Sequence, residues 1–304
     1  MALFGMLNVG LNAVTQYQDY VAGLIPPSGR EANWLIEKEA AGRAFNPTAA
    51  LNSTNRVFAE STESSSPLRN TVNEDRVIVL GKLSSEDTSW LQDISPGWRH
   101  AIYVVDDPNP DHRVQVNKGK ESNVYLQYIL DYYHQLPDYV IFLHAHRSSW
   151  HVEFQEKGNP HAIERLQLEY LKAAGYVNLR CEWGPGCPDE VYPFRQLSER
   201  ATEVAFAGAW MGIFNNSDVP QVIGTPCCAQ FAVTKERILA RPLTDYQHYH
   251  QWLMKTSLDD DTSGRVFEYL WHIIFGEDPV YCPSIQHCYR NVYGLDYEES
   301  SRKT

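Results

Sequence analysis

Short apolar runs alternate with amphipathic segments from residue 76 onward. Residues 77–80, 101–105 and 139–143 read Val-Ile-Val-Leu, Ala-Ile-Tyr-Val-Val and Tyr-Val-Ile-Phe-Leu. Their length and their β-branched and aromatic content predict buried strands. Residues 177–179 and 231–233 predict two further extended segments. Helical spacing of apolar residues predicts helices at 86–91, 122–134, 163–174, 235–240, 246–256 and 265–275. This alternation predicts an α/β fold with a mostly parallel sheet and helices on both faces.

The chain divides into three regions. Residues 1–75 are an N-terminal helix and extended loop region, 76–295 a single α/β domain, and 296–304 a polar tail. Apolar residues between Leu3 and Leu24 predict an amphipathic helix that either packs on the domain or contacts a membrane or partner. Residues 46–73 are rich in Ser, Thr, Asn and Pro and predict a long surface loop.

Charge and hydropathy narrow the class of protein. The net charge of −12 argues against nucleic acid as a partner, because binding it requires a basic face. The absence of a long apolar run predicts no transmembrane helix and a cytoplasmic protein, with endomembrane association through the N-terminal helix as an option. The 8 Trp and 18 Tyr can fill a core or line a pocket for a large apolar ligand.

The six cysteines form three groups along the chain. Their even number suggests disulfides, whereas buried free thiols suit a chain without a signal peptide equally well. The C-x5-C spacing differs from that of structural zinc sites. The three groups are Cys181 with Cys187, Cys227 with Cys228, and Cys282 with Cys288.

The strand at 139–143 runs directly into a polar cluster. In open α/β sheets, ligands bind at the carboxyl ends of strands, so this cluster is the first candidate site. Catalytic hydrogen-bond donors are expected here, although histidines that cap backbone groups in a loop would give the same pattern. The cluster contains His144, His146, Arg147, Trp150 and His151.

Three more places offer polar groups near predicted strand or helix ends. Asp106 and Asp107 follow a strand and either bind a substrate or form an Asp-Pro turn. Lys118 precedes a predicted helix whose first amides can bind an anion, or it lies in a solvated turn. Gln230 and the adjacent cysteines precede a strand and can line a pocket, although core packing is the expected role of the cysteines.

The predicted helix at 265–275 carries a second polar stripe. Arg265, Glu268 and His272 share one face by the i, i+3, i+4 rule, and Trp271 lies beside them. Glu268 can act as a base or hydrogen-bond acceptor in a cleft, while a salt-bridged helix surface is the alternative.

The motifs taken together resemble a known family. The chain resembles fungal domain-of-unknown-function family 3431 over residues 76–295, and residues 1–75 lie outside the resemblance. The matching motifs are Asn117-Lys-Gly, Leu136-Pro-Asp, His144-Ala-His-Arg, Gly175-Tyr-Val-Asn-Leu-Arg-Cys, Pro226-Cys-Cys-Ala-Gln-Phe, Ser263-Gly-Arg and Cys282-Pro.

The resemblance implies a fold like that of GT-A glycosyltransferases and a place in fungal natural-product pathways. In that fold the loop after the equivalent strand carries a DxD motif for Mn²⁺ and a sugar diphosphate. Here the loop reads His144-Ala-His146. Hard cations prefer carboxylate oxygens, so this departure disfavours ordinary glycosyl transfer. Two imidazoles favour zinc or another transition metal, or no metal at all, and we expect none.

Three functions follow as hypotheses. The first is a cyclase that needs no cofactor, with a [4+2] Diels-Alder reaction as one option, acting on an apolar terpenoid-like metabolite. Such a site holds the reacting groups together and aims a hydrogen bond at a carbonyl, with Trp150 and Trp271 as walls. The second is a glycosyltransferase that uses Mn²⁺ and a UDP-sugar at Asp106 or Asp107. The third is a non-catalytic binding protein that docks through residues 1–24.

Overall fold

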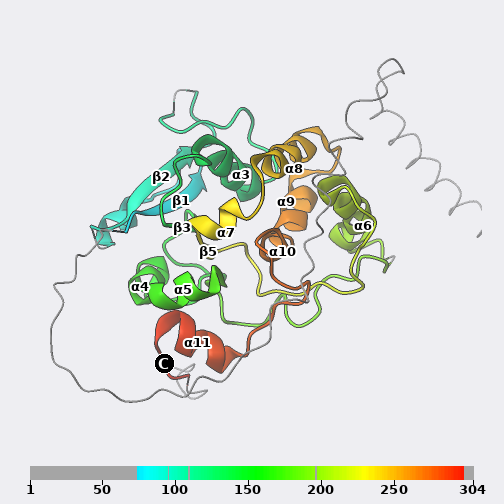
Figure 1. Cartoon of the computed structure of the whole chain (residues 1–304). Helices are drawn as coiled ribbons and strands as arrows, with labels where there is room; N and C mark the ends of the chain where they lie inside the picture. Colours follow the sequence, from blue (N-terminus) through cyan, green and yellow to red (C-terminus); the bar gives the residue numbers. More distant parts are fainter. Residues whose placement is uncertain (1–73, 95, 109, 196, 298–304) are drawn as a thin grey trace, which may run out of the picture. The chain divides into compact units, whose positions relative to one another are not determined.

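The computed structural model describes residues 74–297 except 95, 109 and 196 (Figure 1). The predicted N-terminal helix and long loop lie outside the described residues, as does most of the predicted polar tail. In the part of the chain that is described, no helix is both long enough and apolar enough to cross a membrane.

A five-stranded sheet forms the centre of the domain, with the strand order β2-β1-β3-β5-β4. β1 pairs in parallel with both β2 and β3, whereas β5 runs antiparallel to its neighbours β3 and β4. The prediction of a mostly parallel sheet is therefore confirmed. The strands are β1 (Arg76–Lys82), β2 (Arg99–Val104), β3 (Tyr139–His144), β4 (Tyr176–Asn178) and β5 (Phe231–Thr234).

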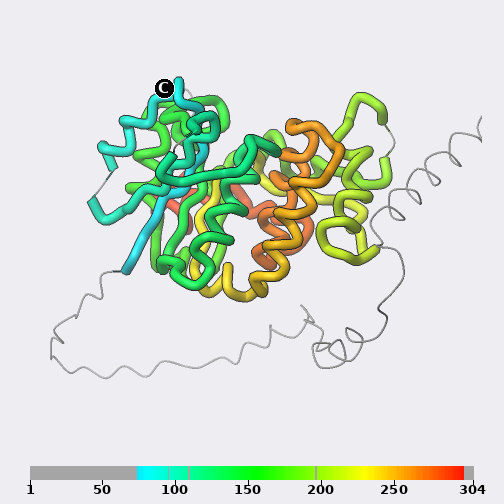
Figure 2. The backbone as a smooth tube through the Cα atoms, turned by 90° about the horizontal axis from the view of Figure 1, so that it is seen from above, coloured from blue at the N-terminus to red at the C-terminus, as the bar shows by residue number. Residues whose placement is uncertain are grey.

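Helices cover both faces of the sheet, because successive strand residues point to opposite sides. Val77 and Val79 of β1 belong to one buried cluster, which also contains residues of the helices α3 (Glu121–Tyr132), α6 (Ala201–Phe214), α7 (Lys235–Leu239), α8 (Leu243–Lys255), α9 (Asp260–Glu268) and α10 (Trp271–Ile274). Ile78 and Leu80 belong to the other cluster, with residues of the 3-10 helix η1 (Ser89–Asp93), α4 (Gly158–Arg165), α5 (Leu168–Ala174) and α11 (Ile285–Tyr293). Figure 2 shows the same helices from above.

Two predicted helices are each divided in two. The helix predicted at 163–174 is α4 followed by α5, and Gly175 ends α5 with a φ of 82°, as expected for a C-cap glycine. The helix predicted at 265–275 is α9 followed by α10. α9 begins in a polar stretch predicted as a loop, because the Asp259 side chain accepts a hydrogen bond from the Thr262 amide. No helix was predicted where α6 and α11 lie.

All six cysteines form disulfides, so the free-thiol alternative is wrong. The two outer groups pair with each other: Cys181 bonds to Cys288 and Cys187 to Cys282, at sequence separations of 107 and 95. Cross-links over such long separations restrict the unfolded chain strongly. Cys227 bonds to its neighbour Cys228.

Candidate functional site

The antiparallel direction of β5 creates the site. Phe142 near the end of β3 pairs with Phe231 at the start of β5. The residues that follow β3 and those that precede β5 therefore meet at one edge of the sheet. His144 and Cys228 both line an open cleft at this edge.

The cleft has a volume of about 660 Å³, which is in the range of small-molecule sites. Its walls come from the start of α3, the start of α6, the loop after β3, the segment before β5, and α9. Polar and charged side chains supply much of the lining: Lys120, Glu121, Ser122, His144, His151, Glu190, Glu199, Arg200, Thr202, Glu203, Asp261, Thr262, Arg265 and Glu268.

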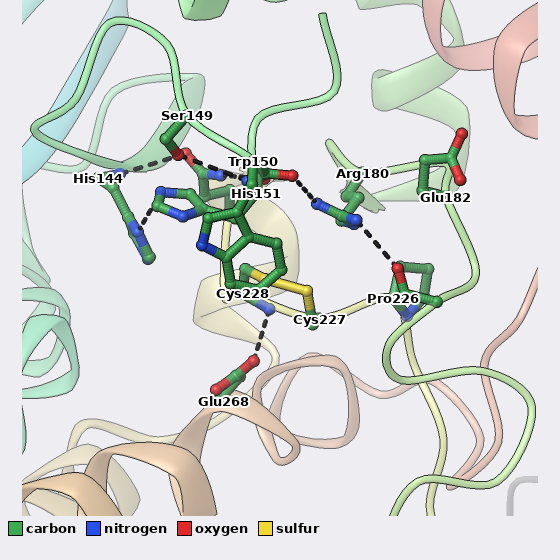
Figure 3. The surroundings of a disulfide bond; sticks show 12 residues. His144, Ser149, Trp150, His151, Arg180, Glu182, Pro226, Cys227, Cys228 and Glu268 are labelled. Atoms are coloured by element: carbon green, nitrogen blue, oxygen red, sulfur yellow. Dashed lines mark hydrogen bonds between the residues drawn. A yellow bond between two sulfur atoms is a disulfide. The ribbon is translucent and has the colours of Figure 1, made fainter. Parts of the chain in front are cut away.

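Glu268 is the most buried carboxyl of α9 and lies at the cleft wall. Its side chain is 17% exposed. Its Oε1 accepts a hydrogen bond of 2.7 Å from the Cys228 amide, and its Oε2 lies 3.7 Å from Nε of Arg265 (Figure 3). Burial raises the pKa of Glu268 above its ordinary value of 4.5, even though the Cys228 hydrogen bond and Arg265 oppose the shift. The site therefore stabilises the protonated form of Glu268 relative to an exposed glutamate.

His144 and His151 form a hydrogen-bonded pair in the same cleft. Nδ1 of His144 lies 3.1 Å from Nε2 of His151, and Nε2 of His144 lies 3.9 Å from Oε1 of Glu121. Burial, and then the nearby His144 and His146, lower the pKa of His151 to about 4. His151 is thus neutral at neutral pH. One ring of the pair donates the shared proton and the other accepts it.

Gln230 holds the histidine pair from behind. Its side chain is buried, and its Nε2 donates to the His151 carbonyl at 3.0 Å while its Oε1 accepts from the His144 amide at 3.4 Å. Gln230 was predicted to contact a substrate. Its contacts instead show a residue that fixes the two histidine backbones.

Trp150 forms an exposed aromatic surface at the cleft. The residue is 60% exposed. The buried Arg180 donates from Nη1 to the Trp150 carbonyl at 3.0 Å, and its guanidinium carbon lies 5.6 Å from the centre of the indole ring. A buried arginine therefore holds an aromatic ring where a ligand can reach it.

The second half of the predicted stripe on 265–275 lies elsewhere. The helix ends at Glu268, so α10 turns Trp271 and His272 into the core, where they are 1% and 0% exposed. Nε2 of His272 lies 3.1 Å from the Pro279 carbonyl, and burial lowers the pKa of His272 to about 4. Neither residue lines the cleft.

Two residues of the histidine cluster face another part of the loop region. Nε2 of His146 lies 3.6 Å from Glu86, and Nη2 of Arg147 lies 3.9 Å from Asp93. Both side chains are about half exposed and neither lines the cleft.

The residues predicted from strand and helix ends also lie away from the cleft. Asp106 accepts hydrogen bonds from the amide and hydroxyl of Ser84, and exposed Asp107 follows it in the same turn. Lys118 donates to the Leu258 carbonyl at 3.2 Å. These residues are not part of the cleft lining.

The carboxylates on the other walls of the cleft were not predicted from the sequence. Glu203 of α6 is 2% exposed and pairs with Arg195 and Arg200. The i, i+3 spacing of Arg200 and Glu203 is the one local signal. Glu121 and Asp261 reach the cleft only because α3 and α9 lie side by side, which the sequence does not reveal.

The donor set does not suit a metal-bound diphosphate. Among the described residues, one group of three possible metal ligands lies close together, namely Cys227, Cys228 and Glu268. The sulfurs of the two cysteines are joined in a disulfide. Asp106 and Asp107, the carboxylates expected to hold Mn²⁺, are outside the cleft.

A comparison with protein-family models identifies the family of this chain. Residues 78–291 match the family described as "Protein of unknown function (DUF3431)". The chain belongs to this family. The match covers the whole sheet apart from the first two residues of β1, together with the cleft. Neither the curated proteins nor the solved structures contain a match.

Proposed function

We propose that this DUF3431 protein is an enzyme that uses Glu268 as a general acid on an oxygen-bearing organic substrate in the cleft. The observation that carries the proposal is the state of Glu268. It is a largely buried carboxyl at the wall of an open cleft, and its pKa is raised. A carboxyl whose protonated form is favoured by burial can donate its proton, or a hydrogen bond, to a substrate oxygen.

The histidine pair supplies a complementary group in the same cleft. His151 is neutral and hydrogen-bonded to His144, so the ring nitrogens of the pair can donate hydrogen bonds to, or accept them from, polar groups of a substrate. Glu268 and this pair line the same cleft, so one substrate can contact both.

The charges of the cleft indicate the substrate class. Acidic residues outnumber basic ones in the lining: Glu121, Glu190, Glu199, Glu203, Asp261 and Glu268 face Lys120, Arg200 and Arg265. A neutral substrate with carbonyl, ether or hydroxyl groups suits this lining better than a polyanion. The exposed Trp150 ring offers its apolar surface.

Cyclisation of an oxygenated terpenoid-like metabolite is one reaction within this proposal. A neutral Glu268 carboxyl can polarise a conjugated carbonyl, which is the electrostatic assistance that a [4+2] cyclisation needs. Of the two tryptophans predicted as apolar walls, Trp150 lines the cleft and Trp271 lies in the core. We therefore place the oxygen-bearing end of the substrate at Glu268 and its apolar part at Trp150.

A glycosyltransferase that uses Mn²⁺ and a UDP-sugar has less support. Its expected carboxylates lie outside the cleft, and the acid-rich lining would repel a free diphosphate. A binding protein without catalysis would leave the raised pKa of Glu268 without a use.

A ligand screen tests the proposal first. Purified protein is melted with neutral oxygenated terpenoids and polyketides, with glycosides, and with UDP-sugars with and without Mn²⁺, because a ligand of the native state raises the melting temperature. We expect a shift from a neutral oxygenated compound. Trp150→Ala should reduce that shift. A nucleotide shift that requires Mn²⁺ would favour the glycosyltransferase instead.

Kinetics with the compound that binds then test the role of Glu268. Glu268→Gln should lower turnover by roughly 10² to 10⁴-fold, the range for loss of a general acid. Activity should fall as pH rises through the raised pKa of Glu268. The matched control is Glu236→Gln on the exposed surface of α7, which should retain wild-type turnover. Equal turnover in Glu268→Gln and Glu236→Gln would refute the proposal.

A further inference from the structure

The segment before β5 has an unusual backbone. Cys228 and Ala229 have φ values of 84° and 49°, which residues with a side chain rarely adopt. Such conformations persist only where surrounding bonds impose them. Here the side chain of Cys228 is joined to its neighbour Cys227, and the Cys227 amide donates to the Pro185 carbonyl at 3.2 Å.

This backbone segment contacts both Glu268 and the two histidines of the cleft. The Cys228 amide donates to Glu268, and two residues later Gln230 contacts the backbones of His144 and His151. A change in conformation at Cys228 would therefore act directly on the Glu268 carboxyl. Cys228 is 8% exposed and lines the cleft, which is the side from which a small thiol would reach the disulfide.

We propose that the Cys227–Cys228 disulfide is a redox-sensitive modification site that positions Glu268. This inference rests on the proposed function of Glu268 and adds a means of regulation to it. In the oxidised form the disulfide keeps the Cys228 amide on the carboxyl. In the reduced form the two side chains separate, the positive φ at Cys228 relaxes, and the amide leaves Glu268.

The reduction is an ordinary thiol–disulfide exchange. A thiolate of a dithiol reductant attacks the Cys228 sulfur, the sulfur–sulfur bond breaks, and Cys227 leaves as a thiolate that takes up a proton. The second thiol of the reductant then attacks the mixed disulfide and releases Cys228. The protein gains two electrons and two protons, and the reductant becomes a disulfide.

The other disulfides serve as internal controls. Cys181–Cys288 and Cys187–Cys282 join residues 107 and 95 positions apart, whereas Cys227 and Cys228 are adjacent. The entropy that a cross-link removes from the unfolded chain grows with loop length, so reducing the long-range pairs opposes folding more strongly. We expect graded dithiothreitol to reduce Cys227–Cys228 while the other two remain oxidised.

The test measures sulfur state and Glu268 protonation in the same full-length samples. Differential alkylation with mass spectrometry reports each disulfide. Carbon NMR of glutamate-labelled protein, with Glu268→Gln to assign the signal, reports the titration midpoint of Glu268. Loss of the Cys228 hydrogen bond should raise this midpoint by about one pH unit, because a hydrogen bond to a charged group stabilises the ionised form.

A variant removes the need for a reductant. Cys227→Ser/Cys228→Ser should show the midpoint of the reduced wild type, and dithiothreitol should cause no further change in it. Circular dichroism checks that the variant is folded. If it is not folded, the comparison of oxidised and reduced wild type still decides the question.

The outcomes separate this inference from the proposed function. A Glu268 midpoint that moves upward on reduction of Cys227–Cys228 supports the inference. The same midpoint in both states, or a Cys227–Cys228 bond that survives until the protein unfolds, overturns it. The absolute midpoint in the oxidised protein tests the proposed function independently, because a value at or below 4.5 would contradict a proton donor.

Discussion

Glu268 and His272 lie four residues apart in the sequence but in different regions of the molecule. The side chain of Glu268 is 17% exposed and His272 is 0% exposed, and burial opposes the charged form of each. Glu268 ends α9 at the wall of a cleft, while His272 lies in α10 within the aromatic core. Burial raises the pKa of the carboxyl and lowers that of the imidazole, and so favours the neutral form of each. Only the group with access to a ligand can use its proton in chemistry.

Trp150 and Trp271 differ in the same way in how much of each residue is buried. Trp150 is 60% exposed at the cleft, and Trp271 is 1% exposed among Tyr125, Phe231 and Phe267. Trp150 is therefore expected to contribute little to stability, whereas Trp271 is expected to contribute much more.

The largest expected effect comes from shortening the core tryptophan. Trp271→Ala should lower the free energy of unfolding by about 3–5 kcal/mol, because it removes a large buried ring and leaves a cavity. Trp150→Ala should change it by less than about 0.5 kcal/mol, as at other surface positions. Denaturant unfolding of both variants measures the difference. Similar losses in the two would break the distinction between cleft and core.

Acid should destabilise the core through His272. The pKa of His272 is about 4 in the folded protein, whereas an ordinary histidine has a pKa of 6.5. The unfolded chain therefore binds the proton more tightly. The stability that His272 contributes is present above pH 6.5 and is lost as the pH falls toward 4, by about 3 kcal/mol for a shift of about 2.5 units. Unfolding of wild type and His272→Gln at pH 7 and pH 4 isolates this contribution. A wild-type-minus-variant difference that does not change with pH would show that His272 is not buried as a neutral group.

A smaller effect of opposite sign is expected at Glu268. Its raised pKa means that the folded protein holds the proton more tightly than the unfolded chain, so stability falls as the pH rises from 4.5 through the folded pKa. Gln cannot ionise and keeps an oxygen for the Cys228 amide. Glu268→Gln should therefore be more stable than wild type by about 1 kcal/mol at pH 8, a size common for replaced active-site groups.

The control for this prediction is again Glu236→Gln, which should melt like wild type at both pH values. The advantage of Glu268→Gln should shrink toward pH 4.5. If Glu268→Gln is instead destabilised at pH 8, the carboxylate is favoured in the fold and a proton-donor role loses its basis.

The sequence predicted the sheet well and the site only in part. The three apolar runs that form β1, β2 and β3 are long enough and apolar enough to leave little choice. His144, Trp150, His151, Arg265 and Glu268 do line one cleft. His144 ends β3, Trp150 and His151 lie in the loop after it, and Arg265 and Glu268 belong to α9.

The remaining features depend on tertiary contacts. The helix after Glu268 was predicted to continue, so His272 was placed on the wrong face; a break at Tyr269 and Leu270 turns it inward. The disulfide pairing joins groups about a hundred residues apart, which spacing alone cannot assign. Glu203 lines the cleft and pairs with Arg195 and Arg200, and neither its place in the cleft nor its burial was predicted.

The titration of the Glu268 carboxyl in oxidised wild-type protein decides whether this residue can act as an acid. Infrared difference spectra of wild type minus Glu268→Gln, recorded across pH, follow the carboxylic acid band of this one residue. We expect a protonated carboxyl that persists above pH 4.5 and loses its proton at the raised midpoint. A carboxylate at pH 4.5 and above would refute the proposal and leave the cleft without its proposed acid.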